Sequence, residues 1–225
     1  MTPLPADPHA AAVRHLSLAD PRMGALISRA GPCRLAVGGS APAATTSYRE
    51  DHFGGLVDAI VSQQLSAKAA STIFRRVLAL ASSEEGRLLP GKLLALPEAK
   101  LREAGLSGSK VGFVRDLSAR VDRGALVLDA LDAQTDDEVI AELCEVKGIG
   151  RWTAEMFLIF RLGRPDVLPV GDLGVQKGFV RLFGLRKLPA PERMVKLSRP
   201  FRPYRSVACW YLWRLNEEKP EVEER

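Results

Sequence analysis

Residues 143–179 read LCEVKGIGRWTAEMFLIFRLGRPDVLPVGDLGVQKGF, and this stretch decides the fold. Near its start, Gly148 and Gly150 flank the apolar Ile149 between two predicted helices. The pattern predicts a tight hairpin in which Ile149 is buried and both glycines leave the backbone open to a ligand. The hairpin amides and the N-terminus of the following helix would suit an anion such as a DNA phosphate. On its own, a glycine pair of this kind is usually only a turn.

The rest of the chain carries helical signals almost throughout. Thr135 and Glu138 form a capping-box pattern that opens a helix running to about Glu145. Ser109 is predicted to cap a helix over Lys110–Arg123. No segment shows sustained period-two alternation, so the predicted fold class is all-α. Further helices are predicted at 21–30, around 53–61, and at 151–162, 173–183, 191–197 and 204–215.

The composition is that of a globular protein, with 46% hydrophobic and 26% charged residues in a chain of 225. Intrinsic disorder, collagen-like repeats and coiled coil are excluded on these figures. No apolar run approaches the ~18 residues that a membrane span needs. The three cysteines, Cys33, Cys144 and Cys209, form no CxxC pair, so neither a zinc site nor an iron–sulfur cluster is expected. Their odd number favours a reducing compartment, and we expect a cytoplasmic bacterial protein associated with nucleoid DNA.

Positive charge is concentrated in one segment. Residues 147–214 carry 14 Lys and Arg against 4 Asp and Glu, whereas residues 1–146 carry 16 against 18. Arginine outnumbers lysine 23 to 9 in the whole chain, which suits bidentate contacts to phosphate. The charge boundary lies at the hairpin, because residues 124–146 hold seven acidic residues and no basic one. A solvated basic surface with no ligand remains the alternative explanation.

With these features the sequence resembles the helix–hairpin–helix DNA glycosylase superfamily, and most closely its 3-methyladenine DNA glycosylase II branch. The resemblance is carried by GIGRWTA followed by Asp172, by AIVSQQLSAKAA at 59–70 and by FRPYRSVACWYLW at 201–213. It covers roughly residues 20–215, without the extra N-terminal β-domain of some members. It implies two helical subdomains with the active-site cleft between them. The first implied part, residues 1–50, is an N-terminal segment with one helix that packs on the C-terminal helices. The second, residues 51–165, is a helical subdomain that ends in the helix–hairpin–helix at about 136–163. The third, residues 166–225, contains the C-terminal helices and an acidic tail at 217–225.

The resemblance assigns Asp172 as the catalytic residue. Cleaving an N-glycosidic bond builds positive charge on the sugar, and a fixed carboxylate facing C1′ stabilises that charge. From its local sequence alone, Asp172 is predicted to be a helix N-cap. The two roles are compatible, since helix-end amides keep an aspartate ionised.

The same resemblance implies a base pocket of Trp152, Met156 and Trp213. Bifunctional relatives have a Schiff-base lysine where this chain has Trp152, so a monofunctional enzyme without strand-nicking activity is expected. A cationic alkylated purine over an indole gains ~0.5–2 kcal/mol. For Trp213, core packing is an equally good interpretation. Relatives often have tyrosine in place of Met156 and an acidic residue in place of Gly171, so we expect a wider pocket and a broad range of alkylated bases.

The remaining assignments concern DNA. Gln64 and Leu65 match the family's DNA-wedging segment, although Gln64 also fits an ordinary polar helix end. We expect double-stranded damaged DNA as the partner, a monomeric protein, no membrane partner and no required cofactor. The carbonyls of Cys144, Val146 and Gly148 are implied as ligands of a structural Na⁺ or K⁺. The expected phosphate-binding residues are Lys147, Gly148, Gly150, Arg151, Lys177 and Arg205.

Two other functions remain open at this point. One is a non-catalytic helix–hairpin–helix DNA-binding module, which needs no Asp172 beside an aromatic pocket. The other is a glycosylase for a different lesion, such as hypoxanthine or uracil. The three histidines, His9, His15 and His52, fit no triad or metal spacing and are expected at the surface.

Overall fold

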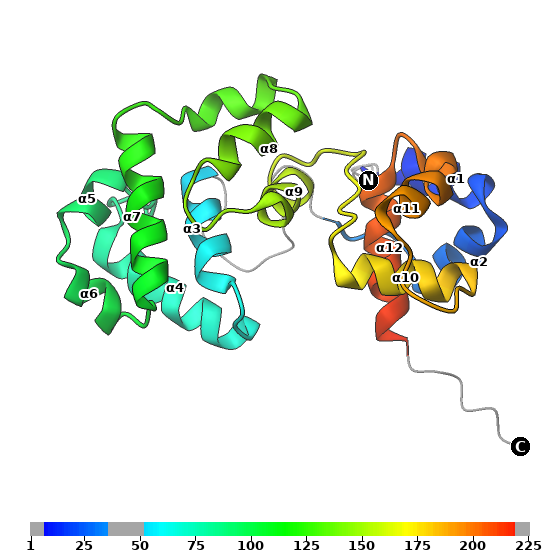
Figure 1. Ribbon diagram of the computed structural model, residues 1–225, viewed down its shortest axis with the longest axis horizontal. Helices are drawn as coiled ribbons and strands as arrows, with labels where there is room; N and C mark the ends of the chain where they lie inside the picture. The colour runs from blue at the N-terminus through cyan, green and yellow to red at the C-terminus, as the bar shows by residue number, and fades with distance from the viewer. Residues whose placement is uncertain (1–6, 36–51, 219–225) are drawn as a thin grey trace, which may run out of the picture. The chain divides into compact units, whose positions relative to one another are not determined.

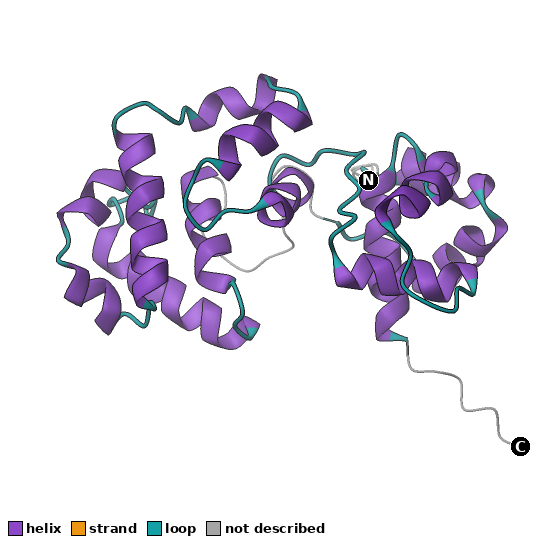
Figure 2. Cartoon of the chain, viewed as in Figure 1, coloured by secondary structure: helices purple, strands orange, loops and turns teal. Residues whose placement is uncertain are grey.

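The computed structural model describes residues 7–35 and 52–218, and over these ranges it contains helices and no strand (Figures 1 and 2). An isolated bridge between Ser82 and Leu88 is the only strand-like pairing in this part of the chain. None of the described helices has the length and apolar content to cross a bilayer. The chain forms two compact units, residues 1–37 with 163–225 and residues 38–162. An all-α fold is therefore confirmed.

The unit of residues 38–162 is built around α3 (His52–Ser62), whose Leu56, Val57 and Ile60 are fully buried. Helix α3 is followed by α4 (Ala67–Ala81), α5 (Pro90–Ala95), α6 (Glu98–Glu103), α7 (Gly108–Asp122), η2 (Leu128–Ala133), α8 (Asp136–Cys144) and α9 (Arg151–Phe160). Helix α3 contacts α4, α7, α9 and the 3₁₀-helix η2.

In the other unit, α12 (Arg205–Glu217) is the central helix, and it packs against α10 (Leu173–Phe183). The Tyr211 side chain is fully buried and its hydroxyl donates a hydrogen bond to the Gly31 carbonyl at 3.0 Å. A Cβ at Gly178 would lie 2.6 Å from the Leu212 Cβ, so glycine lets α10 approach α12 closely. The helices are α1 (Ala10–Ala19), α2 (Pro21–Ala30), α10 (Leu173–Phe183), α11 (Pro191–Leu197), the 3₁₀-helix η3 (Arg199–Phe201) and α12 (Arg205–Glu217).

Most predicted helices are present, and the differences have local causes. Thr135 and Glu138 do form a capping box. Ser107, not Ser109, caps α7, because its hydroxyl accepts the Lys110 N–H at 3.3 Å. In the described residues 7–35, the N-terminal segment has two helices where one was expected. Helix α1 was missed because its N-cap, His9, makes no side-chain cap and so leaves no signal.

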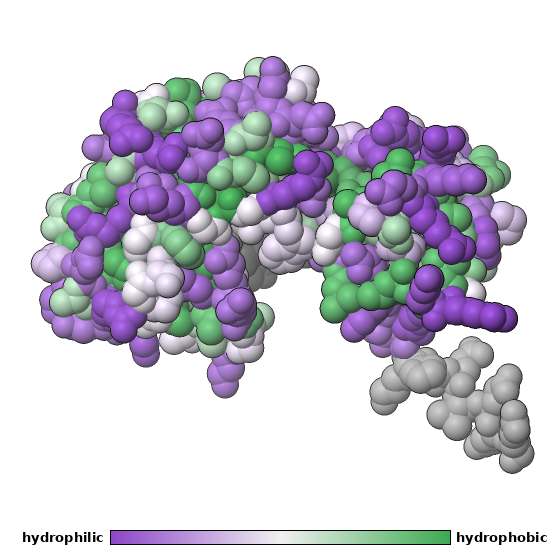
Figure 3. All heavy atoms as spheres, in the orientation of Figure 1, coloured by the Kyte–Doolittle hydropathy of each residue, from purple (hydrophilic) through white to green (hydrophobic). Residues whose placement is uncertain are grey.

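Large apolar side chains are exposed at scattered positions. Apolar and polar residues are intermixed over the face shown in Figure 3. Two of the exposed side chains belong to residues with an expected role, Trp152 in the base pocket and Leu65 in the DNA-wedging segment.

Candidate active site

The glycine hairpin joins α8 to α9. Ile149 is buried at 4% exposure and its N–H donates to the Val146 carbonyl at 3.0 Å. Gly148 has φ +83, and a Cβ there would lie 2.2 Å from the Phe113 Cδ2. Glycine is thus required at 148 both by the backbone conformation and by the aromatic ring against it.

The hairpin exposes backbone N–H groups. Gly148 and Gly150 are exposed, and their N–H groups donate to no other residue in the described part of the chain. The Lys147 N–H donates to the Asp116 carboxylate at 3.0 Å, which fixes the start of the hairpin. Because α9 begins at Arg151, its first amides add the positive end of a helix to this site.

A pocket of about 910 Å³ in this unit brings four predicted residues together. Trp152 and Met156 line it from α9, and Gln64 and Leu65 line it from the turn after α3. Trp152 is 47% exposed, so its ring is accessible to a ligand. Sequence reasoning missed other lining residues, which carry no local motif: Ala59, Ser62, Gln63, Ser107, Ser109, Lys110, Phe113 and Thr153.

The turn of residues 63–65, called the wedge turn below, has an unusual backbone. Gln64 has φ +56 and is the only non-glycine residue with a positive φ among those described. Leu65 is 41% exposed, and Ser66 caps α4 directly afterwards. A left-handed non-glycine residue is strained and persists only where its surroundings hold it, which is common at functional sites.

Asp172 is the N-cap of α10 in the other unit. Its Oδ1 accepts the Val175 N–H at 2.7 Å and the Trp213 indole N–H at 2.9 Å. A Cβ at Gly174 would lie 2.8 Å from the Trp213 Cδ1, so the indole lies against the first turn of α10. Trp213 is half-buried and binds the carboxylate, which sets it apart from an ordinary core residue.

The segment around Asp172 is held by backbone and amide contacts. The Asp172 N–H donates to the Pro169 carbonyl at 3.0 Å, and the Gln176 amide donates to the Val170 carbonyl at 2.8 Å. Gly171 is exposed, with nothing within 4 Å of where its Cβ would lie. Glycine therefore leaves open space beside the carboxylate.

The expected phosphate-binding side chains differ in their surroundings. Lys147 and Lys177 are exposed. Arg151 is also exposed, and its Nε donates to Glu155 at 2.9 Å. The structure gives Arg205 a different role from the expected one: its side chain is only 12% exposed and donates to both carboxylate oxygens of Asp166, at 2.7 and 2.8 Å. Arg205 is thus part of a structural ion pair.

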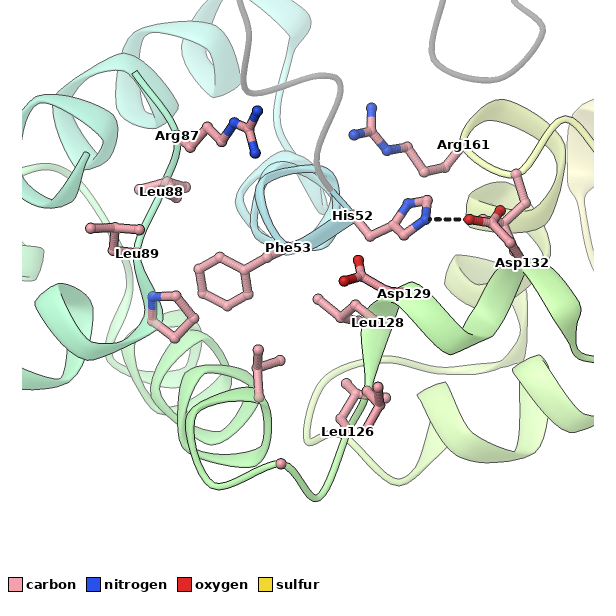
Figure 4. Close-up of a pocket in the computed structure, with 15 residues that line it drawn as sticks. His52, Phe53, Arg87, Leu88, Leu89, Leu126, Leu128, Asp129, Asp132 and Arg161 are labelled. Carbon is pink, nitrogen blue, oxygen red and sulfur yellow. Dashed lines mark hydrogen bonds and ion pairs between the residues drawn. The ribbon is translucent and has the colours of Figure 1, made fainter. Parts of the chain in front are cut away.

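A second pocket of the same unit, about 760 Å³ in volume, contains none of the predicted residues. Figure 4 shows His52 pointing to Asp132, with Arg87 and Arg161 on the same side of the cavity. The His52 Nε2 lies 3.2 Å from the Asp132 carboxylate. The prediction of surface histidines is wrong for His9, which is 6% exposed and whose Nε2 lies 2.7 Å from the Leu35 carbonyl oxygen.

Comparison with known proteins identifies close relatives. The profile of the HhH-GPD superfamily of base excision DNA repair proteins matches residues 57–203. The chain is 30% identical over 205 residues to an alkylbase DNA glycosidase-like protein of Schizosaccharomyces pombe, covering 91% of this chain and 92% of the relative.

Two solved structures are similar throughout. The DNA-3-methyladenine glycosidase of Bacillus halodurans is 35% identical with a TM-score of 0.78, over 93% of this chain and 92% of that one. The 3-methyladenine DNA glycosylase of Schizosaccharomyces pombe, solved in complex with abasic DNA, is 30% identical with a TM-score of 0.76, over 93% and 98%.

Proposed function

Because the chain belongs to the HhH-GPD superfamily of base excision DNA repair proteins, we propose that it is a monofunctional DNA glycosylase that excises alkylated purines from duplex DNA. Two relatives that match over most of the chain are named for 3-methyladenine excision, the glycosylase of Schizosaccharomyces pombe and the glycosidase of Bacillus halodurans. The observation that carries the proposal is Asp172, an aspartate held by an indole N–H at the start of a helix.

Asp172 acts on the sugar in this proposal. As the C1′–N bond breaks, the bonding electrons leave with the base and C1′ becomes positive. The carboxylate stabilises that charge, and water adds its hydroxyl to C1′ while its proton is released. Purines alkylated at N3 or N7 are already cationic, so they leave as neutral bases and need no general acid.

Trp152 and its neighbours act on the base. A cationic purine stacked on the exposed Trp152 ring gains ~0.5–2 kcal/mol, a selectivity of about tenfold. The weak glycosidic bonds of alkylated bases therefore supply most of the discrimination. Met156 is flexible and defines a wall less sharply than tyrosine does, and Gly171 adds neither bulk nor charge. These two residues support a range that extends from 3-methyladenine to 7-methylguanine.

DNA phosphates are held by the hairpin and the basic segment. The Gly148 and Gly150 amides and the exposed Lys147, Arg151 and Lys177 provide the contacts. The backbone amides position a phosphate without reading sequence. Further exposed cations lie on and around α11, at Arg186, Lys187, Arg193, Lys196, Arg199 and Arg202.

The reaction as proposed uses no cofactor. In the described ranges, no cluster of three or more His, Cys, Asp or Glu side chains is arranged to hold a metal ion. A cation at the hairpin would have to share two of its three expected carbonyls, because Val146 accepts from Ile149 and Gly148 accepts from Gln63. None of the proposed steps needs such an ion.

The protein is further proposed to act as a monomer, beside the DNA in the reducing cytoplasm of a bacterium. None of the three cysteines, all of which lie in the described ranges, forms a disulfide bond, and this supports such a compartment. Two of them, Cys33 and Cys209, are buried, and burial raises the pKa of the Cys33 thiol to about 11. A thiol with so high a pKa is protonated and unreactive.

Base release tests this function directly. Duplexes that each contain one 3-methyladenine, 7-methylguanine, hypoxanthine or uracil are incubated with the protein, and the free base is measured. Release of the two alkylated purines is expected. Binding without release from any duplex would favour the DNA-binding module, and release of hypoxanthine or uracil alone would favour the other glycosylase.

A further inference from the structure

The wedge turn requires something to hold its strained backbone. Gln64 has φ +56, a conformation that a non-glycine residue adopts at a cost of roughly 1–3 kcal/mol. The turn directly follows the last residue of α3, Ser62, where helical carbonyls lose their partners. The groups that satisfy these carbonyls also determine how the turn projects.

The carbonyls of Ile60 and Ser62 accept the N–H groups of Gln63 and Leu65, and Lys110 of α7 is the donor to two further carbonyls. Its Nζ donates to the Val61 carbonyl and to the Gln63 carbonyl, each at 2.7 Å. A cation at the C-terminal end of a helix is favoured by the helix dipole as well as by its hydrogen bonds. The side chain is half-buried, and desolvation lowers the pKa of its ammonium group.

Gln63 joins the wedge turn to the hairpin. Its Nε2 donates to the Gly148 carbonyl at 2.8 Å, although the two residues are 85 positions apart. Helix α7 supports the hairpin as well, because Phe113 packs against Gly148 and Asp116 accepts the Lys147 N–H. One side of α7 therefore contacts both the segment expected to enter the duplex and the segment expected to hold its phosphates.

We propose that Lys110 and Gln63 are positioning residues, which hold the wedge turn in the conformation from which Gln64 and Leu65 project. Base extrusion therefore depends on Lys110 and Gln63. This inference rests on the proposed function. Both residues line the 910 Å³ pocket, but their side-chain donors are taken up by the backbone carbonyls of Val61, Gln63 and Gly148, so neither is given a part in breaking the glycosidic bond. Their loss lowers the rate only where a stacked base must first leave the duplex.

The test compares one lesion in two settings, a fully paired duplex and an internal loop of unpaired bases within the same duplex. The variants are Lys110→Met and Gln63→Met, which remove the donors and keep the bulk. For each protein, the single-turnover rate of base release from the paired duplex is divided by the rate from the loop. In both variants this ratio is expected to be about tenfold lower than in the wild type. Lys110→Arg, which keeps a cation and donors, is expected to restore the ratio.

Lys92→Met is the matched control, since the Lys92 Nζ also donates to a helix-end carbonyl, that of Ser82, at 2.7 Å. It removes the same charge and is expected to leave the ratio unchanged. Equal losses in both settings, or an unchanged ratio, would overturn the inference. If Lys110→Met does not fold, Gln63→Met alone tests the inference.

A second readout does not depend on base release. The fluorescence of 2-aminopurine placed beside a stable abasic analogue rises when the protein unstacks the duplex. A smaller rise with Lys110→Met and Gln63→Met at saturating protein is expected, and an unchanged rise contradicts the inference. If the wild type unstacks DNA but releases no base, the proposed function fails while the positioning role stands.

Discussion

The indole N–H of Trp213 donates to the Oδ1 of Asp172 at 2.9 Å, joining residues 41 positions apart. The same oxygen accepts the Val175 N–H at 2.7 Å as the N-cap of α10. Two donors from two helices therefore fix the rotamer of the carboxylate. The helix cap and the proposed catalytic group are one side chain, held in place before any substrate arrives.

Replacing Trp213 with phenylalanine should slow base release while leaving DNA binding intact. The ring remains, but the donor that orients the carboxylate is lost, and we expect a single-turnover rate about tenfold lower. Trp210→Phe on the same helix is the control, because the Trp210 ring contacts Tyr211 and Arg214 rather than Asp172. Equal rates for the two variants would mean that the indole hydrogen bond has no catalytic importance.

Gly148→Ala should destabilise the unit of residues 38–162. The new Cβ would overlap the Phe113 ring and would sit on a backbone with φ +83. We expect the free energy of unfolding to fall by about 1–3 kcal/mol. Gly112→Ala has the opposite expected sign, about 0.5–1 kcal/mol more stable, because Gly112 is an exposed helical position with open space at its Cβ. Urea unfolding of both variants checks the pair, and a stable Gly148→Ala protein would contradict the tight hairpin.

Met156→Tyr should narrow the range of excised bases. Met156 lines the 910 Å³ pocket beside Trp152, and a rigid ring there reduces the space for a purine methylated on its N7 side. The measurement is the rate of 7-methylguanine release divided by that of 3-methyladenine release, for wild type and variant. We expect the ratio to fall. A wild type that is already specific for one small lesion, or a ratio that does not change, would contradict the open pocket.

The protein should leave an abasic strand intact. Trp152 occupies the position where bifunctional relatives have a nucleophilic lysine, and residues 148–176 contain no lysine. Borohydride in the reaction should therefore trap no covalent adduct with DNA. A bifunctional glycosylase run in parallel is the positive control. A trapped adduct that disappears in Lys177→Met would identify the nearest lysine after this range as an unexpected nucleophile.

The sequence predicts local features well where one segment carries the whole signal. The Thr135 capping box, the buried Ile149 and the N-cap at Asp172 depend on a few neighbouring residues, and all three are present. His9 was misjudged because its burial depends on Leu35, which lies 26 positions away. Arg205 was misjudged for the same reason, since Asp166 lies 39 positions before it.

The site is predictable only in part. The resemblance named Gln64, Leu65, Trp152 and Met156, and the structure places these four around one pocket. It did not name Lys110, whose two hydrogen bonds to backbone carbonyls depend on how α7 packs against α3. A lysine with no neighbouring motif gives no signal of that role in the sequence.

The central claim is that Asp172 supplies negative charge to the transition state, and Asp172→Asn tests it most directly. Asparagine is a good N-cap and can accept the Trp213 N–H, so the fold is preserved and only the charge is lost. The measurement is single-turnover release of 7-methylguanine, together with the affinity for the same duplex. Asp20→Asn is the control, because Asp20 is likewise an N-cap aspartate, of α2 in the same unit. The account predicts that Asp172→Asn lowers release by about 10²–10³-fold, with near-normal binding, and that Asp20→Asn releases base normally. Near wild-type release by Asp172→Asn would contradict it and place the catalytic group elsewhere.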